Sequence, residues 1–243
     1  MILYPIKAKP GSLTKSGTTG NNNRQIYKIK SLSQNSNNPC DTLNLNPLCL
    51  FSARLSQELF TIISCFEVSL RNAVNGHYVG VHGSDWLRDS CRQGGMFDNL
   101  HCRTTAGIIR NVIIFMGTLY SHSKTLARMD FGFWRYLFAQ PQYRAGGQSL
   151  LRIFPAKPIS TSIIHYNHSY IFNELAKVND IRNRIAHHEP ICFQYQIPAI
   201  STAYARQHYA LLLQLFQWMN VDEAALLYGL DHINEVCSQI DCL

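Results

Sequence analysis

The sequence predicts an all-α protein, and three observations lead to this fold class. Apolar residues recur at spacings of three and four along most of the chain after residue 48, as they do on one face of a helix. The alternation of apolar and polar residues that marks a half-buried strand never persists beyond a few positions. No internal repeat is present. We therefore expect a single helical bundle over residues 48–243.

Residues 1–47 differ from the rest of the chain. They are rich in Ser, Asn, Thr, Gly and Pro and sustain no apolar period. Residues 1–40 hold six lysines and arginines and no acid. We predict a flexible basic extension here. It is either a solvated tail without a role or an arm that contacts phosphates nonspecifically.

The first helix is predicted from about residue 50. Its apolar face has seven members at spacings of three and four: Leu55, Leu59, Ile62, Phe66, Leu70, Ala73 and His77. Gly76 is expected to loosen its end, with Gly80 and Gly83 in the following turn. Trp86 and Leu87 should anchor the next segment, and Gly94-Gly95 indicates a loop. Further helices are expected over residues 100–119, 123–139, 160–189, 202–219 and 221–228, with a short apolar turn or helix over 148–154.

Composition excludes several classes of protein. Hydrophobic residues make up 46% and charged residues 15%, so wholesale disorder is excluded. The most apolar stretch, 108–120, falls short of the roughly 20 residues of a membrane span. The first residues lack a signal-peptide core, which predicts a cytoplasmic protein. The eight cysteines form no CxxC pair, so we expect buried thiols, no metal site and no cofactor.

One segment concentrates the residues that carry chemistry: Asp180 to Pro190, with the sequence DIRNRIAHHEP. Cleavage of RNA without a metal needs a group that moves protons, and histidine, with an unperturbed pKa of about 6.5, is the usual choice. It also needs a fixed cation against the phosphate, which arginine supplies with a planar fork of donors. An amide can orient either group. On an unbroken helix Asn183 and His187 share a face, whereas Arg182 and His187 are about 140° apart.

Four segments of the chain resemble a known family. The pattern Arg182-Asn183-x-x-x-His187 fits the Arg-polar-x4–6-His signature of the HEPN superfamily of helical RNases. The longer string RNRIAHHEPI resembles the Abi-like family of bacterial abortive-infection proteins. The segments that begin at Phe66 (FEVSLRN), Gly83 (GSDWL) and Phe131 (FGFWRYLF) are similar to further patterns of that family, in the same order. The resemblance covers about residues 50–220.

The resemblance implies a HEPN-like helical bundle that is a homodimer, with one composite site where two motifs meet. It implies a metal-independent endoribonuclease of phage defence or of a toxin system, which leaves a 2′,3′-cyclic phosphate. A small noncoding RNA or a protein antitoxin restrains some members. Carried onto this chain, His187 is the general acid/base, Arg182 stabilises the phosphate and Asn183 orients the substrate. Candidate substrate-binding residues are Arg71, Asn72, Arg184 and His188, although the match itself places no function on His188.

Other interpretations stay open at this stage. A basic cleft formed where two copies of the motif meet can also belong to a noncatalytic regulator that binds a small noncoding RNA. Alternatively, the protein is a helical interaction module that does not bind RNA. Glu67 and Arg71, four residues apart, are expected to form an ordinary helix ion pair, with Arg71-Asn72 facing the cleft as the alternative. His165 and His168 are expected to be ordinary core or surface histidines.

The aromatic residues between 131 and 138 can either stack on unpaired bases or belong to the core. Their density and helical spacing favour the core. The members of this group are Phe131, Phe133, Trp134, Tyr136 and Phe138.

Overall fold

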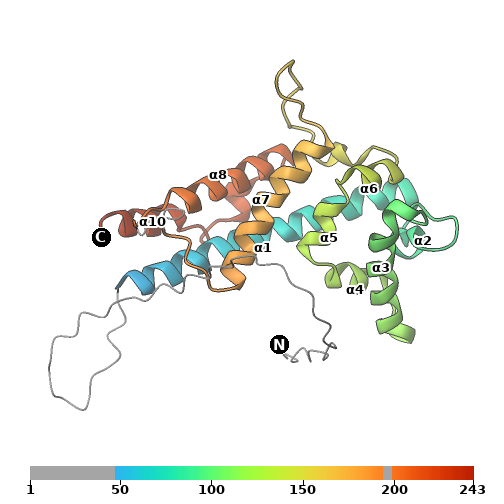
Figure 1. The fold of residues 1–243 in the computed structure, drawn as a ribbon, viewed down its shortest axis with the longest axis horizontal. Coiled ribbons are helices and arrows are strands. Elements are labelled where there is room, and N and C mark those ends of the chain that lie inside the picture. Colours follow the sequence, from blue (N-terminus) through green and yellow to red (C-terminus); the bar gives the residue numbers. More distant parts are fainter. Residues whose placement is uncertain (1–46, 194–198) are drawn as a thin grey trace, which may run out of the picture. The chain divides into compact units, whose positions relative to one another are not determined.

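The computed structural model describes residues 47–193 and 199–243, and this part of the chain is helical (Figure 1). The predicted flexible extension over 1–47 lies outside the described residues, except for Pro47. An antiparallel bridge between Phe193 and Ile200 is the β-structure found in the described part. The helices are α1 (Pro47–His82), α2 (Trp86–Ser90), η1 (Leu100–Cys102), α3 (Arg103–Met116), η2 (Gly117–Leu119), α4 (His122–Arg128), α5 (Phe131–Tyr136), α6 (Gln140–Ala145), η3 (Leu150–Ile153), α7 (His168–Ala186), α8 (Ala203–Trp218), α9 (Glu223–Leu226) and α10 (Ile233–Asp241).

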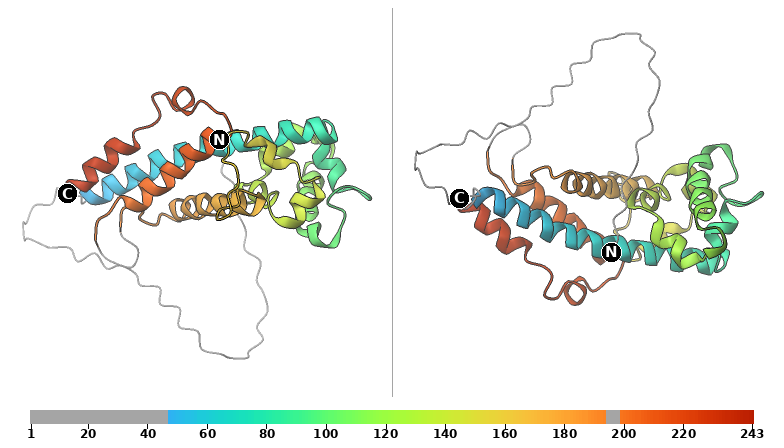
Figure 2. Two further views of the ribbon diagram at one scale, coloured as in Figure 1. Left: turned by 90° about the horizontal axis from the view of Figure 1, so that it is seen from above. Right: turned by 90° about the horizontal axis from the view of Figure 1, so that it is seen from below.

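Helix α1, with 36 residues, is the element against which the others pack. Figures 1 and 2 show α8 and α10 alongside its first half, whereas α2 and the shorter helices gather around its second half. Helices α5 and α7 reach it near the middle, where Phe66 contacts Phe131 of α5 and Phe216 of α8. A single helix therefore joins the C-terminal helices to the central segment of the chain.

The predicted core face of α1 is confirmed over most of its length. Leu55, Leu59, Ile62, Phe66 and Leu70 are fully buried. Beyond Leu70 the face continues through Val74 and Tyr78, one position after the predicted Ala73 and His77.

The prediction that α1 ends near Gly76 is wrong. The helix runs through Gly76 and Gly80 to His82, and the turn comes at Gly83, where φ is +91°. A glycine inside a helix costs about 1 kcal/mol. Packing of Tyr78 against Trp86, with ring centroids 4.7 Å apart, holds the last turns in place.

The single helix predicted over 123–139 is two helices, α4 and α5. Asp130 separates them, because its side chain accepts a hydrogen bond from the backbone N–H of Phe133 at 2.8 Å and so caps α5. The helix predicted from residue 160 begins at His168 instead. There Asn167 is the cap, with its side chain accepting from the N–H of Tyr170 at 3.0 Å. Both caps are signals that the apolar spacing alone does not show.

The remaining helix predictions agree with α3, η3, α8 and α9, to within a few residues at their ends. Helix α10 was not predicted. Its buried residues nevertheless follow the helical spacing: Ile233, Val236, Cys237 and Ile240.

The aromatic group in and just after α5 belongs to the core, because all its members are buried except Tyr136, which is 51% exposed. Cysteines 91, 102, 192 and 237 are buried thiols as expected, whereas Cys49 and Cys242 are exposed. His165 is exposed, and the His168 ring stacks on Tyr143 at 4.6 Å. The described residues contain no cluster of His, Cys, Asp or Glu suited to a metal.

Helix α1 is long and apolar enough, by length and composition, to cross a membrane. This finding departs from the sequence expectation, which considered only residues 108–120. The helix carries a continuous buried face against α8 and α10, as a core helix does. Its opposite face exposes Phe60, Val68 and Val79, so part of its apolar surface has no cover within the described chain.

The central role of α1 can be tested with Phe66→Ala. The substitution should lower the free energy of unfolding by about 3–5 kcal/mol, because it leaves a cavity where three helices meet. Urea denaturation followed by circular dichroism measures this change. Val81→Ala, on the same helix but 51% exposed, is the control and should cost less than about 1 kcal/mol. Equal losses in the two variants would contradict the assigned packing.

Candidate functional site

The motif residues lie at the C-terminal end of α7, which closes with a Schellman motif. The N–H of Glu189 donates to the carbonyl of Arg184 at 2.8 Å, and the N–H of His188 donates to that of Ile185 at 3.0 Å. His188 occupies the left-handed position with φ of +57°, and Pro190 follows where the helix cannot continue. The predicted end of this helix near Pro190 is therefore confirmed, with a defined cap as its cause.

Asn183 and His187 lie one helical turn apart, as predicted. The N–H of His187 donates to the carbonyl of Asn183 at 2.9 Å, so the turn between them is intact. Both side chains are exposed, and neither has a side-chain partner in the described part of the chain. They are thus accessible to a ligand on this side of α7.

Arg182 points toward α1. Its Nε lies 3.6 Å from Oε2 of Glu67, and the side chains of the two residues are 30% and 23% exposed. At this distance the two groups form an ion pair, but they are too far apart for a hydrogen bond. It leaves the buried Nε of Arg182 without a hydrogen-bond partner among the described residues. The guanidinium is therefore held beside α1 but retains donor capacity.

Three charged groups, Arg182, Arg71 and Asp130, act on the carboxyl of Glu67. Arg182 and Arg71 lower the pKa of this carboxyl and Asp130 raises it, whereas burial, the largest effect, leaves the pKa above its ordinary value. Two arginines from different helices, α7 and α1, therefore face one half-buried carboxylate. Asp130 reaches the same place from the cap of α5.

Glu67 and Arg71 do not form the expected ion pair. The partner of Glu67 within 4 Å is Arg182, and Arg71 has no ion pair or hydrogen bond through its side chain among the described residues. The tertiary contact replaces the local one, because α7 brings a second arginine to the same carboxylate. Asn72, next along α1, is exposed. The alternative, in which Arg71-Asn72 face the cleft, stays a prediction.

Arg184 is engaged by its own chain. Its Nη2 donates to the carbonyl of Pro190 at 3.0 Å, its Nε lies 3.3 Å from Oε2 of Glu189, and its guanidinium lies 4.6 Å from the ring centroid of Tyr204. These contacts fasten the segment after the cap to the start of α8. Arg184, which the sequence analysis predicted to bind substrate, therefore stabilises the fold through these contacts.

Sequence reasoning missed His208, which is buried on α8 next to the same region. Its Nδ1 donates to the carbonyl of Tyr204 at 2.8 Å. Burial, together with Lys177 and Arg184, lowers its pKa. The sequence shows only a histidine among the apolar residues of a helix, and this pattern does not predict its burial or its charged neighbours. Glu67 and Asp130 were equally hidden, because their common surroundings come from packing between helices.

The left-handed residue at the end of α7 leads to a stability prediction. Glycine is the residue that this backbone position favours, so His188→Gly should raise the free energy of unfolding by about 1 kcal/mol. His187→Gly is the matched control, since φ there is −91° and no gain is expected. Urea denaturation distinguishes the two. A loss of stability in His188→Gly would show that its imidazole makes a stabilising contact.

Comparison of the chain with protein-family models, with curated proteins and with solved structures finds no match.

Proposed function

We propose that this protein is a metal-independent endoribonuclease whose site contains Arg182, Asn183 and His187. The observation that carries the proposal is the pairing of an exposed His187–Asn183 turn with Arg182, which the Glu67 carboxylate holds beside Arg71. The HEPN-like signature of these residues supports the same chemistry. The likeness of the chain to the Abi-like family further supports a role in phage defence or as a toxin. We expect such a protein to act in the cytoplasm. A small noncoding RNA or a protein antitoxin would restrain it.

In the proposed reaction the 2′-hydroxyl of RNA attacks the adjacent phosphorus atom. One imidazole takes the proton of the 2′-hydroxyl while the bond from phosphorus to the 5′-oxygen breaks, and a second imidazole protonates that oxygen. The products are a 2′,3′-cyclic phosphate and a 5′-hydroxyl. Arg182 stabilises the negative charge on the five-coordinate phosphate, and Asn183 orients the substrate.

A homodimer supplies the second imidazole. Within one chain Arg182 points at α1, whereas His187 lies five residues later on a different side of α7. Two chains related by a twofold axis would place a second copy of His187 opposite the first. The uncovered apolar residues of α1, Phe60 and Val68, provide surface for such an association.

One observation favours the alternative, a noncatalytic regulator that binds a small noncoding RNA. The ion pair with Glu67 offsets the charge of Arg182, and a cation that is already paired contributes less to a transition state. Such a protein would bind RNA through the same residues without cleaving it.

Cleavage by purified protein in EDTA separates these functions. Wild-type protein should cut single-stranded RNA, and His187→Ala and Arg182→Ala should each slow cleavage by at least about 100-fold, because each removes a group that acts on the phosphate or its protons. His165→Ala and Arg92→Ala, at exposed positions elsewhere, are the controls. The readout is the yield of 2′,3′-cyclic phosphate ends.

Persistent cleavage by His187→Ala would overturn the assignment. Salt-dependent RNA binding by the wild type without any cleavage would favour the regulator. If the protein does not bind RNA at all, the remaining interpretation is a helical interaction module.

Glu67→Gln tests the placement of Arg182. The substitution keeps the shape of the side chain but removes a negative charge close to the expected phosphate, so RNA affinity should rise by roughly three- to tenfold. The cleavage rate constant should fall at the same time, since Arg182 loses its anchor. The matched control is Glu58→Gln on the same helix, where the carboxylate lies 3.3 Å from Nδ1 of His232. Weaker RNA binding in Glu67→Gln would contradict the proposed position of the phosphate.

A further inference from the structure

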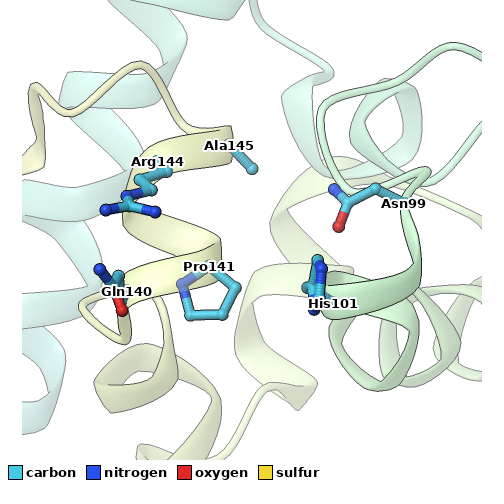
Figure 3. Close-up of a pocket in the computed structure, with 6 residues that line it drawn as sticks. All are labelled: Asn99, His101, Gln140, Pro141, Arg144 and Ala145. Carbon is cyan, nitrogen blue, oxygen red and sulfur yellow. The ribbon is translucent and has the colours of Figure 1, made fainter.

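A pocket opens between η1 and α6 (Figure 3). Its volume is about 500 Å³, within the range of sites that hold small molecules. The lining residues are Asn99, His101, Gln140, Pro141, Arg144 and Ala145. No acidic residue is among them.

The pocket does not belong to the α7 site described above. Helix α6 contacts the start of α7, where Tyr143 stacks on His168. His187 follows 19 positions later, about 28 Å along the helix axis at 1.5 Å per residue.

Two opposite walls of the pocket carry five-membered rings, of which the His101 imidazole is planar. Pro141 and Ala145 of α6 face His101 and Asn99 of the η1 segment across the opening (Figure 3). Figure 3 draws the ring of Pro141 face-on and that of His101 edge-on, so a planar aromatic group in the pocket would stack on the imidazole of His101 and contact the edge of the pyrrolidine of Pro141. The rings therefore suit a heterocyclic base.

The remaining lining side chains suit an anion and a polar base edge. Arg144 and His101 have no side-chain hydrogen bond or ion pair among the described residues, so their donors are free for a ligand. A guanidinium binds phosphate through two parallel hydrogen bonds. Gln140 adds an amide, which can both donate and accept.

The walls are fixed by contacts behind the pocket. Nε2 of Gln142 on α6 donates to Oγ1 of Thr105 on α3 at 3.0 Å, and both residues are buried. Asn99 caps η1, accepting from the N–H of Cys102 at 3.0 Å and donating to the carbonyl of Met96 at 3.1 Å. A preformed site loses less conformational freedom when it binds a ligand.

We propose that this pocket binds a nucleotide, with its base on the imidazole of His101 and its phosphate on Arg144. The inference goes beyond the ribonuclease proposal and holds whether or not the α7 site cleaves RNA. The ligand is either a free mononucleotide or one nucleotide of an RNA chain, because both carry the same base and phosphate groups.

Calorimetric titration of the full chain with AMP, adenosine and inorganic phosphate tests the proposal. AMP should bind more tightly than either fragment, because only AMP offers both a ring and a charge. Arg144→Gln should weaken AMP at least about tenfold and leave adenosine unchanged. His101→Ala should weaken both. Arg152→Gln, at an exposed arginine on η3, is the control and should change neither.

Competition identifies the source of the nucleotide. Displacement of AMP by a short single-stranded RNA supports a nucleotide of an RNA chain, and AMP binding without displacement supports a free nucleotide. The proposal is overturned if AMP does not saturate the protein at millimolar concentration, or if Arg144→Gln binds AMP as the wild type does. These titrations measure binding alone, so loss of cleavage in His187→Ala has no bearing on them.

Discussion

Burial of the apolar face of α1 is the constraint on which the rest of the structure depends. The face runs from Leu55 to Tyr78, about 35 Å along the helix at 1.5 Å per residue. Among the described helices no single partner is long enough to cover it, since α7 has 19 residues and α8 has 16. The chain covers it in pieces, with helices from the central segment and from the C-terminal part of the sequence. The middle of α1, where Phe66 meets α5 and α8, is the place where these pieces join.

The location of the candidate site follows from this arrangement. Glu67 is the neighbour of Phe66, so it lies at the junction but points to the seam between α1 and α7. A carboxylate there is half-buried, and α7 places Arg182 against it. Asp130 reaches the same seam because it caps α5, which packs on Phe66 through Phe131. The polar cluster is therefore set by the apolar contacts next to it.

The apolar spacing was sufficient to predict the long helices, because burial imposes it directly on the residues. It predicted the core face of α1 through Leu70 and the helix that bears His187. It did not predict the break at Asp130 or the start of α7 after Asn167. Each of these boundaries is set by one side chain that accepts a hydrogen bond from a backbone N–H group. A pattern of apolar residues does not record such bonds. At the site, Arg182, Asn183 and His187 could be chosen from their chemistry. That Glu67 pairs with Arg182 and not with Arg71 depends on how two helices far apart in the sequence pack, which no local pattern contains.

The polarity of α7 has a consequence for the direction from which the proposed RNA substrate would reach the motif. The carboxyl end of a helix carries about half a negative charge, so a phosphate is repelled from the tip of α7. The Schellman bonds satisfy the carbonyls of Arg184 and Ile185, but they do not reverse that polarity. Arg182 and Arg184 project from the sides of the last turns, and Arg184 is occupied by Glu189 and Pro190. The flank of α7 that faces α1 is thus the favourable approach for a phosphate. A bound strand would cross the helix there and would not meet it end on.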